Sequence, residues 1–245
     1  MRQLTVIVPT YNEAANLPSL ISELTSLSHP DLKVLIVDDA SPDGTGQLAE
    51  NLAIQLPGRM AVVHRTGKLG LGSAYIKGFQ AALADGAQAI GQMDADFSHS
   101  PSYLSEFLQR LETSDAVFGS RYVEGGRLDE RWSTGRVFLS KFGNTYARVI
   151  LALKIRDATG GFRLWRAETL KAIPLDRIRS EGYVFQVEMA YVAQRLGFNI
   201  AELPIYFEDR RIGQSKMSMG IQIEAALRIW QVLLIHRSLR PTRAR

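Results

Sequence analysis

The 245-residue sequence contains no cysteine. This absence excludes a disulfide framework, a zinc site built on thiolates and a catalytic thiol. Any bound metal ion must therefore use oxygen or histidine ligands. The absence of cysteine also fits a protein that works in a reducing compartment.

Long apolar segments are missing as well. No stretch approaches the roughly 20 consecutive apolar residues that a membrane-spanning helix needs, and the nearest runs are 149–153 and 232–235. The chain enters a strand-like segment at 4–8 without a basic region, a long apolar region or a small-residue cleavage site. We therefore expect a cytoplasmic protein that is soluble or bound to a membrane surface.

Basic residues are fewer than acidic ones in the first half of the chain, and acidic residues are fewer than basic ones in the second half. Residues 1–120 carry 7 Lys and Arg against 13 Asp and Glu, a net charge of −6, whereas residues 121–245 carry 22 against 12, a net charge of +10. An acidic half suits divalent cations, and a basic half suits phosphates, nucleic acid or anionic lipid. We expect the halves to meet different partners, although a solvated surface explains many of these side chains individually.

The first half alternates short β-branched runs with segments that have the length of crossover helices. This pattern predicts an α/β fold, a doubly wound and mostly parallel sheet in one large domain. The predicted strands are 4–8, 33–37, 60–64, 89–93 and 116–119.

The second half is less regular, and its Gly- and Arg-rich segment 124–136 is predicted to be a long, mobile loop. Helices are predicted at 137–155 and 183–196, with a strand at 199–207. A last helix at about 219–235 has only a narrow polar stripe and is followed by four arginines. Such a helix is buried in the domain, buried in a partner or laid on a membrane, and the arginines favour the membrane.

Two aspartates follow the fourth predicted strand, where ligands bind in doubly wound sheets. Asp94 and Asp96 are one residue apart, so both carboxylates can face one hard cation that bridges diphosphate oxygens. The alternative is helix capping, because residues 98–101 open a helix. The position at a strand end favours the metal site.

Further candidate groups follow the second and third strands. An acidic side chain such as Asp38 or Asp39 commonly holds nucleotide hydroxyls or amines in these folds, and a simple turn explains residues 42–44 better than this acidic pair. The glycine-rich segment 67–72 matches neither standard phosphate-loop pattern. An anion-binding helix N-terminus and a tight turn both remain open for it.

Basic side chains recur in the predicted loops. Arginine binds phosphate through two parallel hydrogen bonds, but most arginines in any protein lie in solvent, so composition alone assigns this role to only one or two of them. Neither histidine ligand spacing, a Ser/His/Asp order nor an aromatic platform for nucleic acid is evident, so no nucleic acid partner is expected. The basic candidates are Arg121, Arg136, Arg163, Arg210 and Lys216.

Several ordered motifs together resemble the GT-A glycosyltransferases of family 2. They are the segments 8–13, 37–39 with 41–45, 67–72, 94–96 and 119–122. Two more narrow the resemblance to the dolichol-phosphate, or polyprenol monophosphate, mannose synthases. These are the segments 157–163 and 207–210 with Ser215 and Lys216.

This resemblance implies a catalytic domain over 1–217 and a C-terminal helix with a basic tail over 218–245. It implies that the guanosine part of a sugar nucleotide is held by Pro9, Tyr11, Glu13, Val37 and Asp39. The other implied nucleotide-sugar-binding residues are Lys68, Asp94, Ala95, Asp96, Arg210 and Lys216. It implies Mg²⁺ or Mn²⁺ at Asp94 and Asp96, with Ser98 as a further candidate, and an acceptor phosphate at Arg121, Arg136 and Ser140. Asp94, Asp96 and Arg121 are the implied catalytic residues.

The implied reaction transfers mannose from GDP-mannose to a polyprenyl phosphate with inversion, on the cytoplasmic face of a membrane. Contact with the membrane would come from amphipathic helices or from a small membrane subunit. The alternatives are a related enzyme that uses UDP-glucose, a sugar-1-phosphate nucleotidyltransferase and a nucleotide-binding module without activity.

Overall fold

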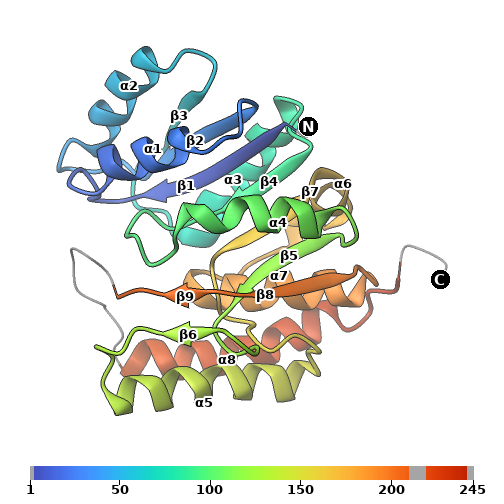
Figure 1. The fold of residues 1–245 in the computed structure, drawn as a ribbon. Helices are drawn as coiled ribbons and strands as arrows, with labels where there is room; N and C mark the ends of the chain where they lie inside the picture. The colour runs from blue at the N-terminus through green and yellow to red at the C-terminus, as the bar shows by residue number, and fades with distance from the viewer. Residues whose placement is uncertain (1–2, 210–218, 242–245) are drawn as a thin grey trace.

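The computed structural model describes residues 3–209 and 219–241, and its centre is a seven-stranded sheet covered by helices on both faces (Figure 1). The strand order is β3-β2-β1-β4-β7-β5-β8, and every strand except β7 runs in the same direction. A small parallel pair, β6 with β9, lies beside it. The strands are β1 (Leu4–Thr10), β2 (Leu32–Asp38), β3 (Met60–His64), β4 (Ala89–Gln92), β5 (Ala116–Ser120), β6 (Arg127–Leu128), β7 (Arg163–Arg166), β8 (Ile200–Pro204) and β9 (Tyr206–Phe207).

The sheet separates two apolar cores because successive side chains of a strand point to opposite faces. In β1, Val6 and Val8 enter the core beneath α1, α2 and α4, while Ile7 enters the core beneath α3 and α7. This two-layer cover confirms the predicted α/β class with a mostly parallel sheet. The helices are α1 (Leu17–Ser26), α2 (Thr45–Gln55), α3 (Leu71–Ala84), α4 (Leu104–Leu111), α5 (Thr134–Leu151), α6 (Ala167–Ala172), α7 (Gly182–Arg195) and α8 (Met219–His236), with short 3₁₀ turns at Pro101–Tyr103 and Leu175–Arg177.

All five predicted strands of the first half are present, with ends that differ by at most two residues. Strand β7 was not predicted. It is four residues long, it follows two glycines, and it begins and ends with arginine, so its sequence lacks the signal of a buried strand. It runs antiparallel between β4 and β5, and the interpretation of Arg163 as a loop residue is therefore wrong.

Two predicted boundaries in the second half are also wrong. The strand predicted at 199–207 divides at Ile205, so that β8 joins the main sheet and β9 pairs with β6. The loop predicted at 124–136 contains β6 and the start of α5. This helix begins at Thr134 because the Ser133 hydroxyl accepts a hydrogen bond from the Arg136 N–H.

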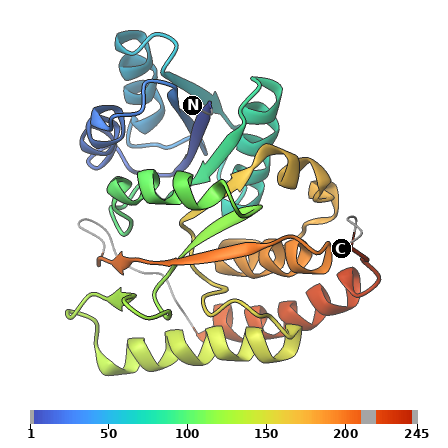
Figure 2. The ribbon, with the colours of Figure 1, turned by 45° about the vertical axis from the view of Figure 1, so that its right-hand side comes forward.

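Helices α5 and α8 lie side by side along the edge of the molecule opposite α1 and α2 (Figures 1 and 2). α8 also packs on α7, burying Ala225, Ile229 and Val232. Its other face exposes Leu227 and Trp230. Among residues 3–209 and 219–241, no helix combines the length and the apolar character that crossing a membrane requires.

A buried hydrogen bond between His236 and Glu188 fixes the end of α8. The His236 Nε2 lies 2.7 Å from the Glu188 Oε1, and both side chains are fully buried. The Glu188 Oε2 accepts hydrogen bonds from the backbone N–H groups of Arg179 and Ser180. Burial alone would raise the pKa of Glu188, but the hydrogen bonds from His236 and Ser180 outweigh it and lower the pKa.

We predict that Glu188→Gln lowers the free energy of unfolding by about 1–3 kcal/mol at neutral pH, because charged hydrogen bonds are lost in a buried site. The folded-state pKa of Glu188 lies below its ordinary value of 4.5, so this stabilisation is present above pH 4.5. It is lost as the pH falls through the folded-state pKa. Urea unfolding of both proteins from pH 7 to pH 3 measures the difference, and a difference that stays constant over this range contradicts the prediction.

Candidate active site

Backbone strain gathers where the strands end. In the described part of the chain four non-glycine residues have a positive φ, and three of them, Asn12 (63°), Ala40 (53°) and Phe97 (62°), follow β1, β2 and β4 respectively. Non-glycine residues adopt this left-handed region at an energetic cost, and such residues cluster at functional sites. The strain therefore marks the carboxyl edge of the sheet, where the sequence places most of its candidate residues.

A cavity of about 220 Å³, here called the strand-end cavity, lies at this edge. It brings together residues from four loops that are far apart in the sequence. Val37 does not line it, because this side chain is buried within β2. The lining includes the predicted residues Pro9, Tyr11, Glu13, Asp39, Lys68, Asp94, Ala95 and Asp96.

Asp39 is held in place by groups that sequence reasoning missed. Its Oδ1 accepts a hydrogen bond from Arg65 at 2.7 Å, and its Oδ2 accepts one from the Leu69 N–H at 3.0 Å. Arg65 also donates to the Ser73 hydroxyl. Asp38 plays a different part, because its carboxylate binds Thr10 and Ser41 within the fold. Of the two aspartates, only Asp39 lines the cavity.

The glycine-rich segment 67–72 leads into a helix N-terminus that binds a carboxylate from another part of the chain. The carboxylate of Glu181 accepts hydrogen bonds from the N–H groups of Gly72 at 2.7 Å and Ser73 at 3.3 Å, at the start of α3. Gly70 has a φ of 102°, and a Cβ there would lie 2.3 Å from the Glu181 Oε2. The loop is therefore a tight turn onto a helix whose first N–H groups bind Glu181. Lys68 leaves it to lie 4.1 Å above the Tyr11 ring.

Asp94 and Asp96 are both oriented by hydrogen bonds. The Tyr75 hydroxyl donates to the Asp94 Oδ1 at 3.0 Å. Burial, with the nearby Asp94 charge, raises the pKa of Tyr75 well above its ordinary value, so the phenol remains a donor. The Asp96 Oδ1 accepts hydrogen bonds from the N–H and the hydroxyl of Ser98. Ser98 thus contacts Asp96, and its role as a metal ligand stays a prediction.

The donor set fits a hard divalent cation, because both aspartates supply carboxylate oxygens at one end of a strand. The Asp94 Oδ2 faces Gly161, where a Cβ would lie 3.4 Å from it, in ordinary van der Waals contact. No group of three His, Asp or Glu that could hold a metal occurs in the described part of the chain. Two carboxylates therefore leave coordination positions for substrate oxygens or water.

Arg121 forms a buried pair with Asp157. Its Nε and Nη2 donate to the two carboxylate oxygens at 2.7 Å each, and Nη2 also donates to the Thr159 hydroxyl. Burial opposes both charges, yet each ion stabilises the other, so the pKa of Asp157 is lowered and that of Arg121 is raised. The remaining nitrogen, Nη1, has no hydrogen-bond partner among the described residues.

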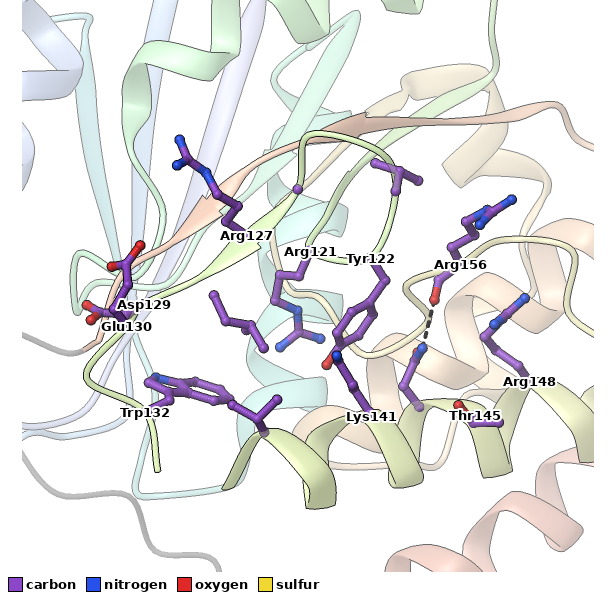
Figure 3. A pocket seen from close by; sticks show the side chains of 15 residues that line it. Arg121, Tyr122, Arg127, Asp129, Glu130, Trp132, Lys141, Thr145, Arg148 and Arg156 are labelled. Carbon is purple, nitrogen blue, oxygen red and sulfur yellow. Dashed lines mark hydrogen bonds between the residues drawn. The ribbon is translucent and has the colours of Figure 1, made fainter. Parts of the chain in front are cut away.

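A larger cavity of about 660 Å³, here called the trough, runs between Arg121 and α5 (Figure 3). Arg121, Tyr122 and Lys141 line its middle, whereas Arg136 and Ser140 do not line it. Arg136 instead stacks 3.7 Å above the Trp132 ring and binds Asp209 at 2.9 Å. The Ser140 hydroxyl lies 2.8 Å from the hydroxyl of Tyr122, which does line the trough.

Two consecutive glycines join these regions. A Cβ on Gly160 would lie 3.0 Å from the Gly119 carbonyl oxygen and 3.4 Å from the Asp157 Oδ2, while Gly161 faces Asp94. The Asp94 carboxylate and the Arg121–Asp157 pair are thus on either side of one turn of chain. The guanidinium of Arg163 fixes this turn, because it donates to the carbonyl oxygens of Gly160 and Ala158.

Arg210 and Lys216 lie outside the described residues. Their predicted part in binding the diphosphate therefore stays a prediction.

Residues 5–173 match glycosyl transferase family 2. The chain belongs to this family. It is 48% identical over 229 residues to undecaprenyl-phosphate mannosyltransferase from Micrococcus luteus, which covers 94% of the chain and 93% of that protein. It is 45% identical over 223 residues to polyprenol monophosphomannose synthase from Mycolicibacterium smegmatis, covering 91% and 83%.

Solved glycosyltransferase structures share the fold. A mannosyltransferase from Pyrobaculum calidifontis in complex with GDP-Man and Mn²⁺ has a TM-score of 0.63 at 20% identity, covering 100% of this chain and 66% of that chain. Glucosyl-3-phosphoglycerate synthase from Mycobacterium tuberculosis, with Mn²⁺ and UDP, has a TM-score of 0.66 at 18% identity, covering 98% and 82%. The GT-A fold and the glycosyltransferase class of this family 2 enzyme are thereby confirmed.

We predict that Tyr75→Phe weakens Mn²⁺ binding in the presence of GDP by about 10–100-fold, because the group that orients Asp94 is lost. Electron paramagnetic resonance of free Mn²⁺ during a titration measures this directly. Tyr191→Phe, at another buried tyrosine that lies in α7, is the control and should bind Mn²⁺ as the unaltered enzyme does. Equal affinities of the two variants would contradict the orienting role of Tyr75.

Proposed function

We propose that this glycosyltransferase transfers mannose from GDP-mannose to a polyprenyl monophosphate, with inversion at the anomeric carbon. The observation that carries the proposal is the short separation of two unlike sites, the Asp94 carboxylate and the Arg121–Asp157 pair, across Gly160 and Gly161. The names of the two relatives at 48% and 45% identity support the lipid acceptor and the sugar. The neighbour in complex with GDP-Man and Mn²⁺ supports the donor.

The strand-end cavity would bind the sugar nucleotide. Asp39, clamped by Arg65, offers carboxylate oxygens to donors of the guanosine part, and Tyr11 offers an aromatic face beneath Lys68. Asp94 and Asp96 would hold Mg²⁺ or Mn²⁺, with Ser98 orienting Asp96. A cation bound there offsets the negative charge that grows on the departing diphosphate. Arg210 and Lys216 are proposed to contact the same diphosphate.

Arg121 would bind the acceptor phosphate through Nη1, the one guanidinium nitrogen that its bonds to Asp157 and Thr159 leave without a partner in the described residues. Arg136 and Ser140 would complete the grip after Arg136 exchanges Asp209 for the phosphate. A phosphate oxygen forms the new bond to the anomeric carbon while the bond from that carbon to GDP breaks. The nucleophile is already anionic near neutral pH, so no general base is needed.

The decisive experiment incubates the enzyme with labelled GDP-mannose and polyprenyl phosphate. We expect a labelled lipid, no product in EDTA, and recovery of turnover with Mn²⁺ or Mg²⁺. Asp96→Ala should reduce turnover at least 100-fold, which corresponds to about 2.7 kcal/mol of transition-state stabilisation. Asp176→Ala, at an exposed position in a 3₁₀ turn, is the control and should retain activity.

Two outcomes would contradict the proposal. Preferential labelling from UDP-glucose would assign the enzyme to the related glucosyltransferases. Full turnover by Asp96→Ala would remove the metal site from the mechanism.

We further propose that the enzyme is peripheral to the cytoplasmic face of a membrane, through α8 and the basic tail of residues 218–245 together with α5. Eight of the ten large apolar side chains that are most exposed in the described residues lie on these two adjacent helices. A monomer rarely exposes so continuous an apolar surface without a partner. The eight side chains are Phe138, Phe142, Val149, Ile223, Leu227, Trp230, Leu234 and Ile235.

We predict that Phe138→Gln and Leu227→Gln each reduce co-sedimentation with phosphatidylglycerol-containing vesicles at least tenfold, because burying such a side chain contributes about 1.5–3 kcal/mol. Phe138 and Leu227 are 71% and 62% exposed. Ile54→Gln, at a residue of α2 that is 77% exposed, is the matched control and should sediment as the unaltered enzyme does. If the unaltered enzyme does not co-sediment with the vesicles, membrane binding through this face is contradicted, and a small membrane subunit becomes the expected partner of the face.

A further inference from the structure

The trough has opposite charges at its two ends. Figure 3 shows Asp129 and Glu130 beside Trp132 at one end, and Arg148 beside Arg156 at the other. Lys141 lies between Arg121 and the basic end. The proposed acceptor site at Arg121 therefore occupies the middle of the trough and leaves its basic end unused.

The charges at the acidic end are already compensated. The Asp129 carboxylate accepts hydrogen bonds from Arg131 and from the Asp209 N–H. Glu130 accepts a hydrogen bond from the Tyr206 hydroxyl at 2.8 Å and also lies near Arg127. This end of the trough therefore offers little net attraction to a cation and repels an anion only weakly.

The charges at the basic end are not compensated in this way. In the described ranges, none of Lys141, Arg148 and Arg156 forms an ion pair with a carboxylate. Glu202 accepts a hydrogen bond from the backbone N–H of Arg156 and none from its guanidinium. Three cations that line one cavity without a counterion raise the local concentration of anions.

The fold holds these side chains in position for one ligand. Lys141 and Arg148 are seven residues apart on α5, so they face the same way about 10 Å apart along the helix. The loop that carries Arg156 is tied to α5 twice, because Arg148 donates to the Ile155 carbonyl and Asn144 donates to the Arg156 carbonyl. Two guanidinium groups that line the same cavity suit the oxygens of a phosphate group.

The position of α5 indicates where that phosphate comes from. One side of this helix lines the trough, and another exposes Phe138, Phe142 and Val149. If the apolar face lies in the bilayer interface, as proposed above, the basic end lies at the depth of the lipid head groups. We propose that Lys141, Arg148 and Arg156 form a second anion site, which binds the phosphate of an anionic membrane phospholipid beside the acceptor.

Calorimetric titration tests this site with soluble probes and without sugar donor, acceptor or bilayer. The probes are monomeric dihexanoylphosphatidylglycerol, dihexanoylphosphatidylcholine and inorganic phosphate. We expect the full-length enzyme to bind the phosphatidylglycerol at least tenfold more tightly than either of the other two. The triple variant Lys141→Gln, Arg148→Gln, Arg156→Gln should lose at least tenfold of that affinity.

Two further variants make the result specific. Arg156→Gln alone removes an exposed side chain whose hydrogen bonds are made by its backbone, so it keeps the fold and should weaken binding at least threefold. The triple variant Lys77→Gln, Arg110→Gln, Lys171→Gln removes the same charge from exposed positions on other helices and should bind as the unaltered enzyme does.

Three results would overturn the proposal. They are equal binding by the unaltered enzyme and the trough variants, an equal loss in the control variant, and binding of inorganic phosphate as tight as that of the lipid. Because no mannose transfer is measured, a failed transfer assay would count against the proposed reaction and leave this binding result unaffected.

Discussion

The buried guanidinium of Arg163 is the constraint on which the site depends. It donates hydrogen bonds to the carbonyl oxygens of Ala158, Gly160 and Gln186, and it stacks 4.0 Å from the Phe118 ring. Complete burial lowers its pKa to about 9, so the charge is retained at neutral pH by these dipoles and by the field of Asp157. Removing it would break the hydrogen bonds that hold the loop carbonyl groups of Ala158 and Gly160 at the point where the two halves of the site meet.

That meeting point solves an electrostatic problem. A donor diphosphate and an acceptor phosphate repel each other, yet the reaction needs them a few ångströms from the same carbon. The structure places acidic oxygens of Asp94 and Asp96 on one side and the Arg121 guanidinium on the other. Because Asp157 compensates Arg121, this cation is buried without a large penalty and is fixed in direction. The acidic first half and basic second half of the sequence correspond to these two sides.

The sequence was sufficient for the residues whose place follows from topology. The carboxyl ends of parallel strands meet at one edge, so Asp39, Asp94 and Asp96 could be assigned to one site before their contacts were known. The resemblance supplied residues in loops, such as Lys68, that spacing alone left open. Arg136 shows the limit of both arguments, because neither its position in a predicted loop nor the resemblance reveals that it stacks on Trp132 and pairs with Asp209.

The residues that were missed act through contacts distant in sequence. Tyr75 is one of several apolar-facing positions of α3, and only the tertiary fold brings its hydroxyl to Asp94, 19 residues away. Nothing in the local sequence distinguishes Arg65 from other arginines at strand ends, and only the pairing of β2 with β3 brings it to Asp39. Glu181 lies 109 residues from the Gly72 N–H that it binds. Hydrophobic periodicity predicts which face of an element is buried, but it does not predict polar contacts between residues that are distant in sequence.

Helix α5 has three distinct surfaces, and this explains why its pattern was only partly interpretable. Ala147 and Leu151 face the core, Lys141 and Arg148 face the trough, and Phe138 faces outward. A helix with a single apolar stripe would need only one partner. Here the outward apolar surface continues onto α8, which the buried Glu188–His236 pair anchors from behind. The same helix therefore bounds the trough and presents the apolar face, so any surface that covers this face also fixes the orientation of the trough toward that surface.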